Sequence, residues 1–314
     1  MPLEPNRREV LGGAVAIAAA VVAPSAVRAE GRADLAFLVV GDWGRDGASH
    51  QRDVAVQMDV AAQAVDAAFV VSVGDNFYED GVRSVDDPKW RSSFEDVYNG
   101  PHLQKTPWYV ALGNHDYGGV PQAQVDYTAH SPRWRMPARY FKVSGADIGA
   151  PSIDLFIIDT SPLIAENGTG DNAMAVNVRS QDAAAQLTWL DRELAASQAK
   201  HKLVFGHHTV FSGGSTHGDT PDLIDRLLPI LKVHKVSAYI NGHDHDLQHI
   251  VRDGLNVVCT GAGSEIRPVS AVTGTQFCVA RSGFSIISLS GSQLHLEFRD
   301  YTGATLYRAE LLTA

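Results

Sequence analysis

Short, uninterrupted apolar runs alternate along the chain with segments of helical periodicity. The runs cover residues 35–40, 69–73, 108–112, 155–158, 203–205 and 236–240. Because their apolar residues continue without alternation, each run predicts a strand that is buried on both faces. Apolar stripes predict helices over residues 54–67 and 182–198, and a third helix over residues 222–234 that Thr220 and Pro221 would open. This alternation of strands and helices favours an α/β core.

The beginning of the chain predicts an export signal rather than part of the fold. Arg7-Arg8 precede an uncharged stretch over residues 11–23, and Val27-Arg28-Ala29 offers a cleavage site. A stretch this short cannot cross a bilayer of about 30 Å as a helix. The paired arginines are similar to those of a twin-arginine signal, and an uncleaved anchor is the alternative. We therefore expect a signal peptide over residues 1–29, one domain over residues 30–314, and a periplasmic or secreted protein.

Composition and charge exclude several classes of protein. Lys and Arg number 26 against 36 Asp and Glu, which gives a net charge of −10. The chain thus has no electrostatic footprint for nucleic acid or for an anionic membrane. Two cysteines rule out a disulfide scaffold and a thiolate zinc module, while pairing of Cys259 with Cys278 after export stays open. We expect no nucleic-acid partner, no membrane partner after signal cleavage, and a monomer.

Five of the six predicted strands run directly into a short polar cluster. The clusters are Gly41-Asp42-Trp43-Gly44, Gly74-Asp75-Asn76-Phe77-Tyr78, Gly113-Asn114-His115-Asp116, Gly206-His207-His208 and Asn241-Gly242-His243-Asp244-His245. Open α/β sheets place their ligands at the carboxyl ends of strands. A single cluster of this kind is often only a turn or a helix cap. Five clusters at five strand ends predict one shared pocket.

Several side chains in these clusters carry atoms that bind metals. They are Asp42, Asp75, Tyr78, Asn114, His207, His243 and His245. Carboxylate, phenolate, amide oxygen and imidazole together suit iron, manganese or zinc rather than a thiolate site. The set is too large for one ion and suits two if a carboxylate bridges them. Two metals about 3.5–4 Å apart can clamp the attacking and leaving oxygens of a phosphoryl displacement.

The same residues resemble the sequence blocks of the metallophosphoesterase superfamily. The blocks are Asp42, Gly74-Asp75-Asn76, Gly113-Asn114-His115-Asp116, Gly206-His207 and Gly242-His243-Asp244-His245. Trp43-Gly44 and Phe77-Tyr78 narrow the resemblance to purple acid phosphatases of the small, tartrate-resistant type, over nearly the whole mature chain. The resemblance implies an α/β, calcineurin-like metallophosphoesterase fold. In that fold two mixed β-sheets pack as a sandwich flanked by helices, with the site at strand carboxyl ends.

The resemblance also implies a role for each residue of the pocket. It assigns a ferric ion to Asp42, Tyr78 and His245, a bridging position to Asp75, and a second ion, Fe(II), Zn(II) or Mn(II), to Asn114, His207 and His243. His115 and His217 match two histidines near the substrate phosphate, one or both of which assist the leaving group. The sequence departs from close relatives at His208-Thr209, where Tyr-Pro is usual, and at Tyr117 and Asn241, where histidine and cysteine are frequent. These departures bear on pocket shape and substrate preference.

The chain is therefore expected to be an exported dinuclear-metal acid phosphatase. It would hydrolyse phosphate monoesters by in-line attack of a metal-bound hydroxide, while His115 or His217 as an imidazolium protonates the leaving alkoxide. A phosphodiesterase or nucleotide hydrolase on the same centre is the first alternative, and a non-catalytic phosphate- or metal-binding protein is the second. We expect Asp116 and Asp244 to orient turns and Asp159 to be a structural carboxylate. His208 either lines the pocket or fills space behind it.

Overall fold

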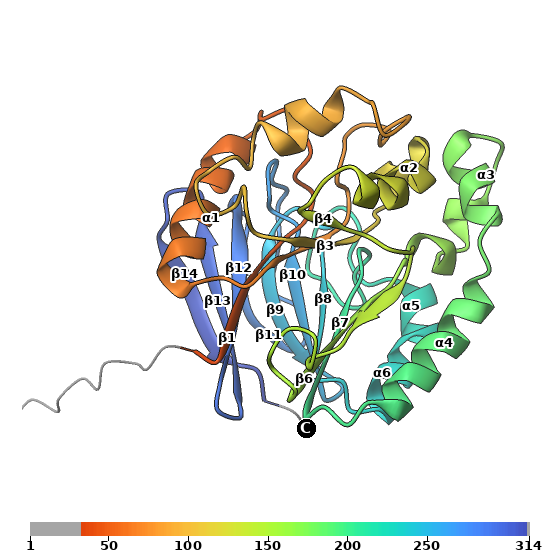
Figure 1. Cartoon of the computed structure of the whole chain (residues 1–314). Coiled ribbons are helices and arrows are strands. Elements are labelled where there is room, and N and C mark those ends of the chain that lie inside the picture. Colours follow the sequence, from red (N-terminus) through yellow and green to blue (C-terminus); the bar gives the residue numbers. More distant parts are fainter. Residues whose placement is uncertain (1–32, 313–314) are drawn as a thin grey trace, which may run out of the picture. The chain divides into compact units, whose positions relative to one another are not determined.

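Two mixed β-sheets form the centre of the computed structural model, which describes residues 33–312 (Figure 1). The first sheet has the order β14 (Thr305–Glu310), β13 (Gln293–Asp300), β12 (Gly283–Ser290), β1 (Leu35–Val40), β2 (Val70–Val73), β3 (Trp108–Ala111), β4 (Trp134–Arg135). The second has the order β11 (Thr275–Val279), β9 (Leu247–Arg252), β10 (Leu255–Thr260), β8 (Ala238–Asn241), β7 (His201–Phe205), β6 (Ile153–Ile157), β5 (Phe141–Val143).

Parallel strands occupy one side of each sheet and antiparallel strands the rest. In the first sheet β1 to β4 are parallel to one another. Strand β12 pairs antiparallel with β1, and β13 and β14 extend the sheet by further antiparallel pairing. In the second sheet β6, β7, β8 and β10 are parallel, while β5, β9 and β11 pair antiparallel. The prediction of two mixed sheets is therefore confirmed.

The sheets pack face to face, and helices cover their outer faces. Ring centroids of Phe37 on β1 and Phe205 on β7 lie 6.2 Å apart, within a buried cluster that both sheets share. Helix α1 (Gln51–Val65) adds Val54 and Met58 to that cluster. A second buried cluster joins the other sheet to α4 (Ala183–Ala196), α5 (Pro221–Arg226) and α6 (Leu228–Val233). Figure 1 shows α1 and the α4–α6 group on opposite sides of the sheets, as a flanked sandwich requires.

The remaining helices lie in the connections above the strand ends. They are the π-helical turn η1 (Trp90–Glu95), the 3-10 turns η2 (His115–Gly118), η3 (Tyr127–Ala129), η4 (Ser161–Leu163) and η5 (Glu166–Gly168), and the α-helices α2 (Pro121–Asp126) and α3 (Ala173–Arg179). No helix within residues 33–312 has both the length and the apolar character needed to cross a membrane. The export signal expected over residues 1–29 falls outside the described residues, and the domain boundary after it stays a prediction.

Most predicted elements are confirmed with small changes of their ends. The strand over 35–40 is β1, and the others appear as β2, β3, β6, β7 and β8. Helix α4 begins at its predicted cap, since the Asp182 side chain accepts the N–H of Ala185 at 2.9 Å. One prediction is wrong: the segment 222–234 forms two helices, α5 and α6, with a break at Leu227. Pro229 explains the break, because it has no N–H to donate to the carbonyl oxygen of Asp225 four residues earlier.

The two cysteines are too far apart to form a disulfide in this fold. Cys259 on β10 and Cys278 on β11 both pair in register with Gln248 of β9. Two interstrand spacings of about 4.8 Å therefore separate them, whereas a disulfide requires Cα atoms within about 7 Å. Both thiols are free in the structure, which answers the question that the sequence left open.

Candidate active site

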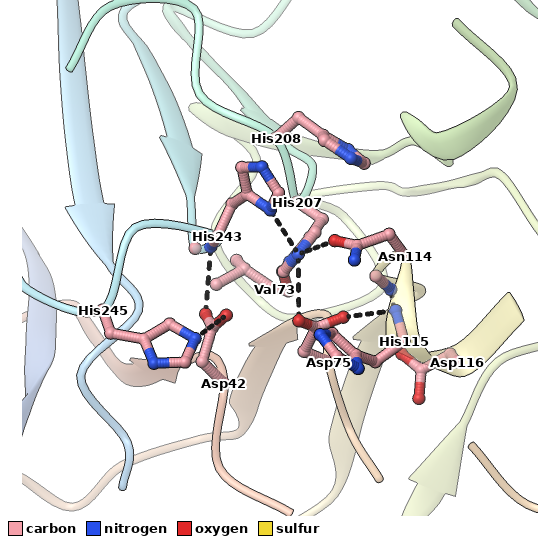
Figure 2. Close-up of polar contacts among 12 residues, drawn as sticks. Asp42, Val73, Asp75, Asn114, His115, Asp116, His207, His208, His243 and His245 are labelled. Atoms are coloured by element: carbon pink, nitrogen blue, oxygen red, sulfur yellow. Dashed lines mark hydrogen bonds and ion pairs between the residues drawn. The ribbon is translucent and has the colours of Figure 1, made fainter. Parts of the chain in front are cut away.

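The carboxyl ends of five strands from the two sheets meet and gather the predicted site residues. Asp42 follows β1, Asp75 follows β2, Asn114 follows β3, His207 follows β7 and His243 follows β8. Figure 2 shows these side chains, with that of His245, turned toward a common space. All seven predicted metal-binding residues come together here through contacts of 3.0–3.4 Å, in two groups.

The first group surrounds the hydroxyl oxygen of Tyr78. This oxygen lies 3.1 Å from Oδ1 of Asp42 and 3.0 Å from Oδ2 of Asp75. It also lies 3.0 Å from Nε2 of His245. A phenol has one proton to donate, so the Tyr78 hydroxyl cannot donate to the carboxylates of Asp42 and Asp75 at the same time. Ligand atoms at about 2.0–2.2 Å from a metal lie about 3 Å from each other, so this spacing fits a cation among the four residues.

The second group surrounds Nε2 of His207. This nitrogen lies 3.1 Å from Oδ1 of Asn114 and 3.2 Å from Nδ1 of His243. It lies 3.4 Å from Oδ2 of Asp75 (Figure 2), the same oxygen that contacts Tyr78 at 3.0 Å. One carboxylate oxygen is thus shared by two groups of donor atoms. A shared carboxylate is the arrangement that two adjacent metal ions need.

Backbone groups orient the donors so that their lone pairs face the centre. Nδ1 of His207 lies 2.9 Å from the carbonyl oxygen of Val73, to which it donates, so the Nε2 lone pair faces the second group. The amide of His243 donates to Oδ2 of Asp42 at 3.0 Å, and the amide of His115 donates to Oδ1 of Asp75 at 2.9 Å. Each carboxylate therefore has one oxygen held by the backbone and the other turned to the donor groups.

The buried charges of the site require a compensating positive charge. Burial by itself raises the pKa of Asp75, but His207 and His115 more than offset this and hold it well below its usual range. Burial acts to lower the pKa of His207, whereas Asp75 and Asp42 raise it to about 9. Burial together with Asp42 and Asp75 raises the pKa of Tyr78 well above its ordinary value. Without a metal, a proton on Nε2 of His207 meets this demand in part, and a cation between the groups would take the place of that proton on the Nε2 lone pair.

The backbone is strained at three of the candidate ligands. Asp42, Asp75 and His243 have φ of 58°, 52° and 72°, values in the left-handed region that non-glycine residues seldom adopt. Such conformations persist where the surrounding structure enforces them, and they concentrate at functional sites. Two glycines make room for the carboxylates: a Cβ on Gly113 would overlap Oδ1 of Asp75, and one on Gly242 would overlap Oδ2 of Asp42.

Asp116 and Asp244 fasten turns, as expected from the sequence. Asp116 is fully buried and accepts the N–H groups of Asn76, Phe77 and Gly113 at 3.1, 3.2 and 2.8 Å. Figure 2 shows its carboxylate turned away from His207 and Asn114. Burial and the nearby Asp75 raise the pKa of Asp116 to about 6. Asp244 accepts the hydroxyl of Ser212 and, at 3.3 Å, the N–H of Gly218, which holds the loop that carries His217.

A cavity of about 230 Å³ opens above the donor groups. It is lined by Asp75, Asn114, His115, Thr216, His217, His243, His245 and Arg267. The two predicted substrate histidines thus both face it. Nδ1 of His115 lies 2.6 Å from the carbonyl oxygen of Glu79 and donates to it, which leaves Nε2 for the cavity.

His217 is held differently from His115. Its ring stacks on His243 with centroids 3.8 Å apart, and its Nε2 lies 3.1 Å from Nη1 of Arg267. An arginine only donates, so Nε2 of His217 accepts this hydrogen bond and the ring is neutral in this arrangement. Desolvation lowers the pKa of His217. The charge of Asp244 acts to raise this pKa, whereas the charges of Arg267 and His207 lower it further. The predicted imidazolium role is therefore better served by His115.

Sequence reasoning missed two arginines beside the site. Arg45 lies with its guanidinium 3.8 Å from the centre of the Tyr78 ring and forms ion pairs with Glu79 and Glu265 at 3.1 and 2.8 Å. Arg267 lines the cavity. The sequence offers one sign of Arg45, which directly follows the Trp43-Gly44 pair of a strand-end cluster. Nothing in the sequence around Arg267 indicates that this residue lies at the site.

His208, whose role the sequence left open, and Asp159, which was expected to be structural, are both buried outside the cavity lining. His208 is buried, with Nδ1 2.8 Å from Oγ1 of Thr160 and Nε2 3.3 Å from Nδ2 of Asn167. It packs 4.4 Å from the His243 ring, between centroids, and is not among the cavity-lining residues. Asp159 is buried and accepts the hydroxyl of Tyr117, which agrees with the expected structural role.

Comparison with known proteins decides the family. Residues 35–247 match the family described as calcineurin-like phosphoesterase. Purple acid phosphatase 4 of Arabidopsis thaliana is 37% identical over 286 residues, which cover 87% of this chain and 82% of that protein. Tartrate-resistant acid phosphatase type 5 of Sus scrofa is 33% identical, with coverage of 88% and 86%. The chain belongs to the purple acid phosphatase family of calcineurin-like phosphoesterases.

Solved structures agree with the fold. The chain is similar to GAP50, the anchor in the inner membrane complex of Plasmodium, with a TM-score of 0.76, 25% identity and 89% coverage of each chain. It is similar in fold to purple acid phosphatase PPD1 from yellow lupin seeds, with a TM-score of 0.67 and 14% identity over 88% of this chain and 53% of that one. As a purple acid phosphatase the protein is a metallophosphoesterase hydrolase with a dinuclear metal centre, so the predicted fold and enzyme class are confirmed.

Proposed function

We propose that the protein is an exported acid phosphatase that hydrolyses phosphate monoesters at a dinuclear centre held by the two donor groups. The observation that carries the proposal is the Oδ2 atom of Asp75, which lies 3.0 Å from the Tyr78 hydroxyl and 3.4 Å from Nε2 of His207. The assignment gives one ion, Fe(III), to Asp42, Tyr78, Asp75 and His245. It gives the other, Fe(II), Zn(II) or Mn(II), to Asp75, Asn114, His207 and His243. Phenolate and carboxylates suit the harder ion, and imidazole suits the borderline one.

The residues of this chain account for binding and proton transfer. When bound, the two ions polarise the phosphate and supply the nucleophile for an in-line displacement. His115 then protonates the leaving oxygen from Nε2, because its Nδ1 is committed to the carbonyl of Glu79 at 2.6 Å. The His115 amide also fixes Asp75, so one residue links the proton donor to the shared carboxylate. His217, which accepts from Arg267, positions the cavity wall.

The size of the cavity fits a single phosphoryl group. At about 230 Å³ it is smaller than the roughly 300–1,000 Å³ of pockets that enclose drug-sized ligands. It therefore holds one phosphoryl group and the first atoms of its ester, and the rest of the substrate would extend from its open side.

The decisive experiment compares two substrates on protein of known metal content. Purified enzyme is analysed for metals and by visible spectroscopy, then assayed with p-nitrophenyl phosphate and its bis-ester from acidic to neutral pH. We expect two metals per chain, a phenolate-to-iron absorption band, and faster hydrolysis of the monoester below neutral pH. Faster hydrolysis of the bis-ester would favour the phosphodiesterase alternative.

A binding role is the second candidate, since the similar structure GAP50 is described as an anchor. The intact donor groups and the cavity-facing His115 support catalysis instead. Protein that holds two metals yet hydrolyses no phosphate ester would favour the binding role.

Export is a separate part of the proposal and has its own test. Cell fractionation should place the wild-type protein in the periplasm or medium, without residues 1–29. Conservative replacement of Arg7 and Arg8 by lysine tests the twin-arginine route, because retention in the cytoplasm is expected only for that route. Size-exclusion chromatography checks the expected monomer.

A further inference from the structure

Arg267 reaches the rim of the cavity from the loop that follows β10. Its backbone N–H donates to the carbonyl oxygen of His245 at 2.9 Å, so the loop is fastened beside a proposed metal ligand. Its side chain lines the cavity together with His115 and Thr216. Of the described residues that line this cavity, Arg267 alone carries a permanent positive charge.

The charge of Arg267 is not neutralised by a carboxylate. Within residues 33–312 it forms no ion pair, and the acid two residues away, Glu265, is bound to Arg45 at 2.8 Å. Its side-chain partner is Nε2 of His217 at 3.1 Å, a neutral acceptor that uses one of five N–H donors. Arg133, by contrast, is buried and paired with Glu95 at 2.6 Å, as expected of an arginine that only supports the fold.

The position of Arg267 relative to the donor groups defines what it can contact. It touches His217, and His217 stacks on His243 of the second group, so the guanidinium lies one side chain outward from the proposed metals. A phosphoryl group bound between the donor groups would thus extend its remaining atoms toward the rim. A guanidinium binds phosphate or carboxylate through parallel hydrogen bonds. Since the net charge of the whole chain is −10, the attraction for an anion at this rim has to come from nearby positive groups.

We propose that Arg267 binds a second anionic group on the substrate and so determines specificity. The enzyme would then prefer substrates whose leaving portion bears its own phosphate or carboxylate, such as inorganic pyrophosphate, over esters of uncharged alcohols and phenols. This inference rests on the proposed function and adds a specificity-determining residue to it. His115 faces the leaving oxygen in both substrate classes and does not distinguish them by charge, whereas Arg267 does.

The kinetic test uses Arg267→Gln and Arg267→Lys, with Arg192→Gln as control. Arg192 is an arginine of α4 with a 69% exposed side chain outside the cavity, so its replacement makes the same change of charge. We expect Arg267→Gln to lower kcat/KM for pyrophosphate about tenfold, mainly through KM, as loss of one charge-assisted contact predicts. The ratio of kcat/KM for pyrophosphate to kcat/KM for p-nitrophenyl phosphate should fall in Arg267→Gln, and Arg267→Lys should retain part of the preference. An equal loss on both substrates, or no loss on either, would overturn the inference.

An equilibrium measurement separates this inference from the proposed function. Methylenediphosphonate, which is not hydrolysed, and orthophosphate are titrated calorimetrically into the metal-loaded wild type and Arg267→Gln. The preference for the diphosphonate should fall about tenfold in the variant. Absence of hydrolysis by the wild type would refute the proposed function, and this binding comparison would still report on Arg267. Equal diphosphonate affinity in both proteins would refute the role of Arg267.

Discussion

The guanidinium carbon of Arg45 lies 3.8 Å from the ring centroid of Tyr78. Carboxylates of Glu79 and Glu265 hold the guanidinium there at 3.1 and 2.8 Å, and only 14% of the Arg45 side chain is exposed. A cation over an aromatic ring in a partly desolvated position contributes about 0.5–2 kcal/mol. The contact therefore favours the phenolate form of Tyr78, which is the form that binds a metal.

The Arg45 contact predicts a spectroscopic effect. In the iron-loaded protein, Arg45→Gln should move the phenolate-to-iron band to longer wavelength, because the phenolate donor orbital rises in energy without the nearby cation. Tyr78→Phe should lose the band altogether. Visible absorption spectra at matched iron content provide the measurement. Arg91→Gln, at a surface arginine with a 77% exposed side chain, is the control and should leave the band unchanged. An unmoved band in Arg45→Gln would contradict the prediction.

The shared oxygen of Asp75 predicts the metal content of its variants. Asp75→Ala removes an atom that contacts both donor groups, so both metals should be lost together and phosphatase activity should fall to background. Elemental analysis after dialysis gives the stoichiometry. Asp53→Ala, at a carboxylate of α1 with a 59% exposed side chain, should keep the wild-type content. Two retained metals in Asp75→Ala would refute the bridging position.

Strands with a largely continuous apolar run could be predicted from the sequence, whereas the wholly buried β10, which includes Asn256, and strands that alternate could not. Strand β1 is buried at all six positions, and its uninterrupted apolar run fixes its ends. Strand β13 instead alternates buried and more exposed residues along its eight positions. Such a strand has one face on the core and one toward solvent, so its signal is period two rather than a continuous run.

The donor residues of the site could likewise be predicted, because each lies in a short motif at a strand end. Arg45 and Arg267 could not, since their roles depend on contacts between distant parts of the chain. Arg45 acquires its position through Glu265, and Arg267 faces the cavity only because its loop is bound to His245. Local patterns do not contain such contacts.

The free Nε2 of His115 predicts a dependence on the leaving group. His115→Ala should lower kcat for an alkyl phosphate about 100-fold, because an alkoxide must be protonated as it departs. The loss should be much smaller for p-nitrophenyl phosphate, whose phenolate leaves without a proton. Steady-state kinetics with both substrates test this, with the exposed His130→Ala as control. Equal losses on both substrates would mean that His115 positions the site and does not protonate the leaving group.

The separation of Cys259 and Cys278 predicts two free thiols in the folded protein. Alkylation of denatured protein without reductant, followed by mass spectrometry, should label both residues. A reducing agent should leave the melting temperature unchanged. If neither cysteine is alkylated and the mass is lower by two hydrogens, the two residues form a disulfide. That result would contradict the observed strand register.

Asp159 predicts how stability changes with pH. The pKa of Asp159 is raised to about 7, chiefly by burial. The hydrogen bond from Tyr117 and the charge of Arg139 act to lower this pKa, whereas the charge of Asp116 raises it further. An aspartate in the unfolded chain has a pKa near 4. Between about pH 4 and about pH 7 the folded protein therefore holds a proton that the unfolded chain has released, so the free energy of unfolding falls as pH rises through this window.

Asp159→Asn removes this ionisation while it keeps the size of the side chain. Relative to the wild type, the variant should gain stability as pH rises from about 4 to about 7, by a few kcal/mol, since one pKa unit corresponds to about 1.4 kcal/mol. Denaturant unfolding at a series of pH values, on both proteins at equal metal content, measures the difference. Asp53→Asn, at an exposed aspartate, is the matched control and should follow the wild type. Parallel curves for Asp159→Asn and the wild type would show that Asp159 is already ionised in the folded protein at acidic pH.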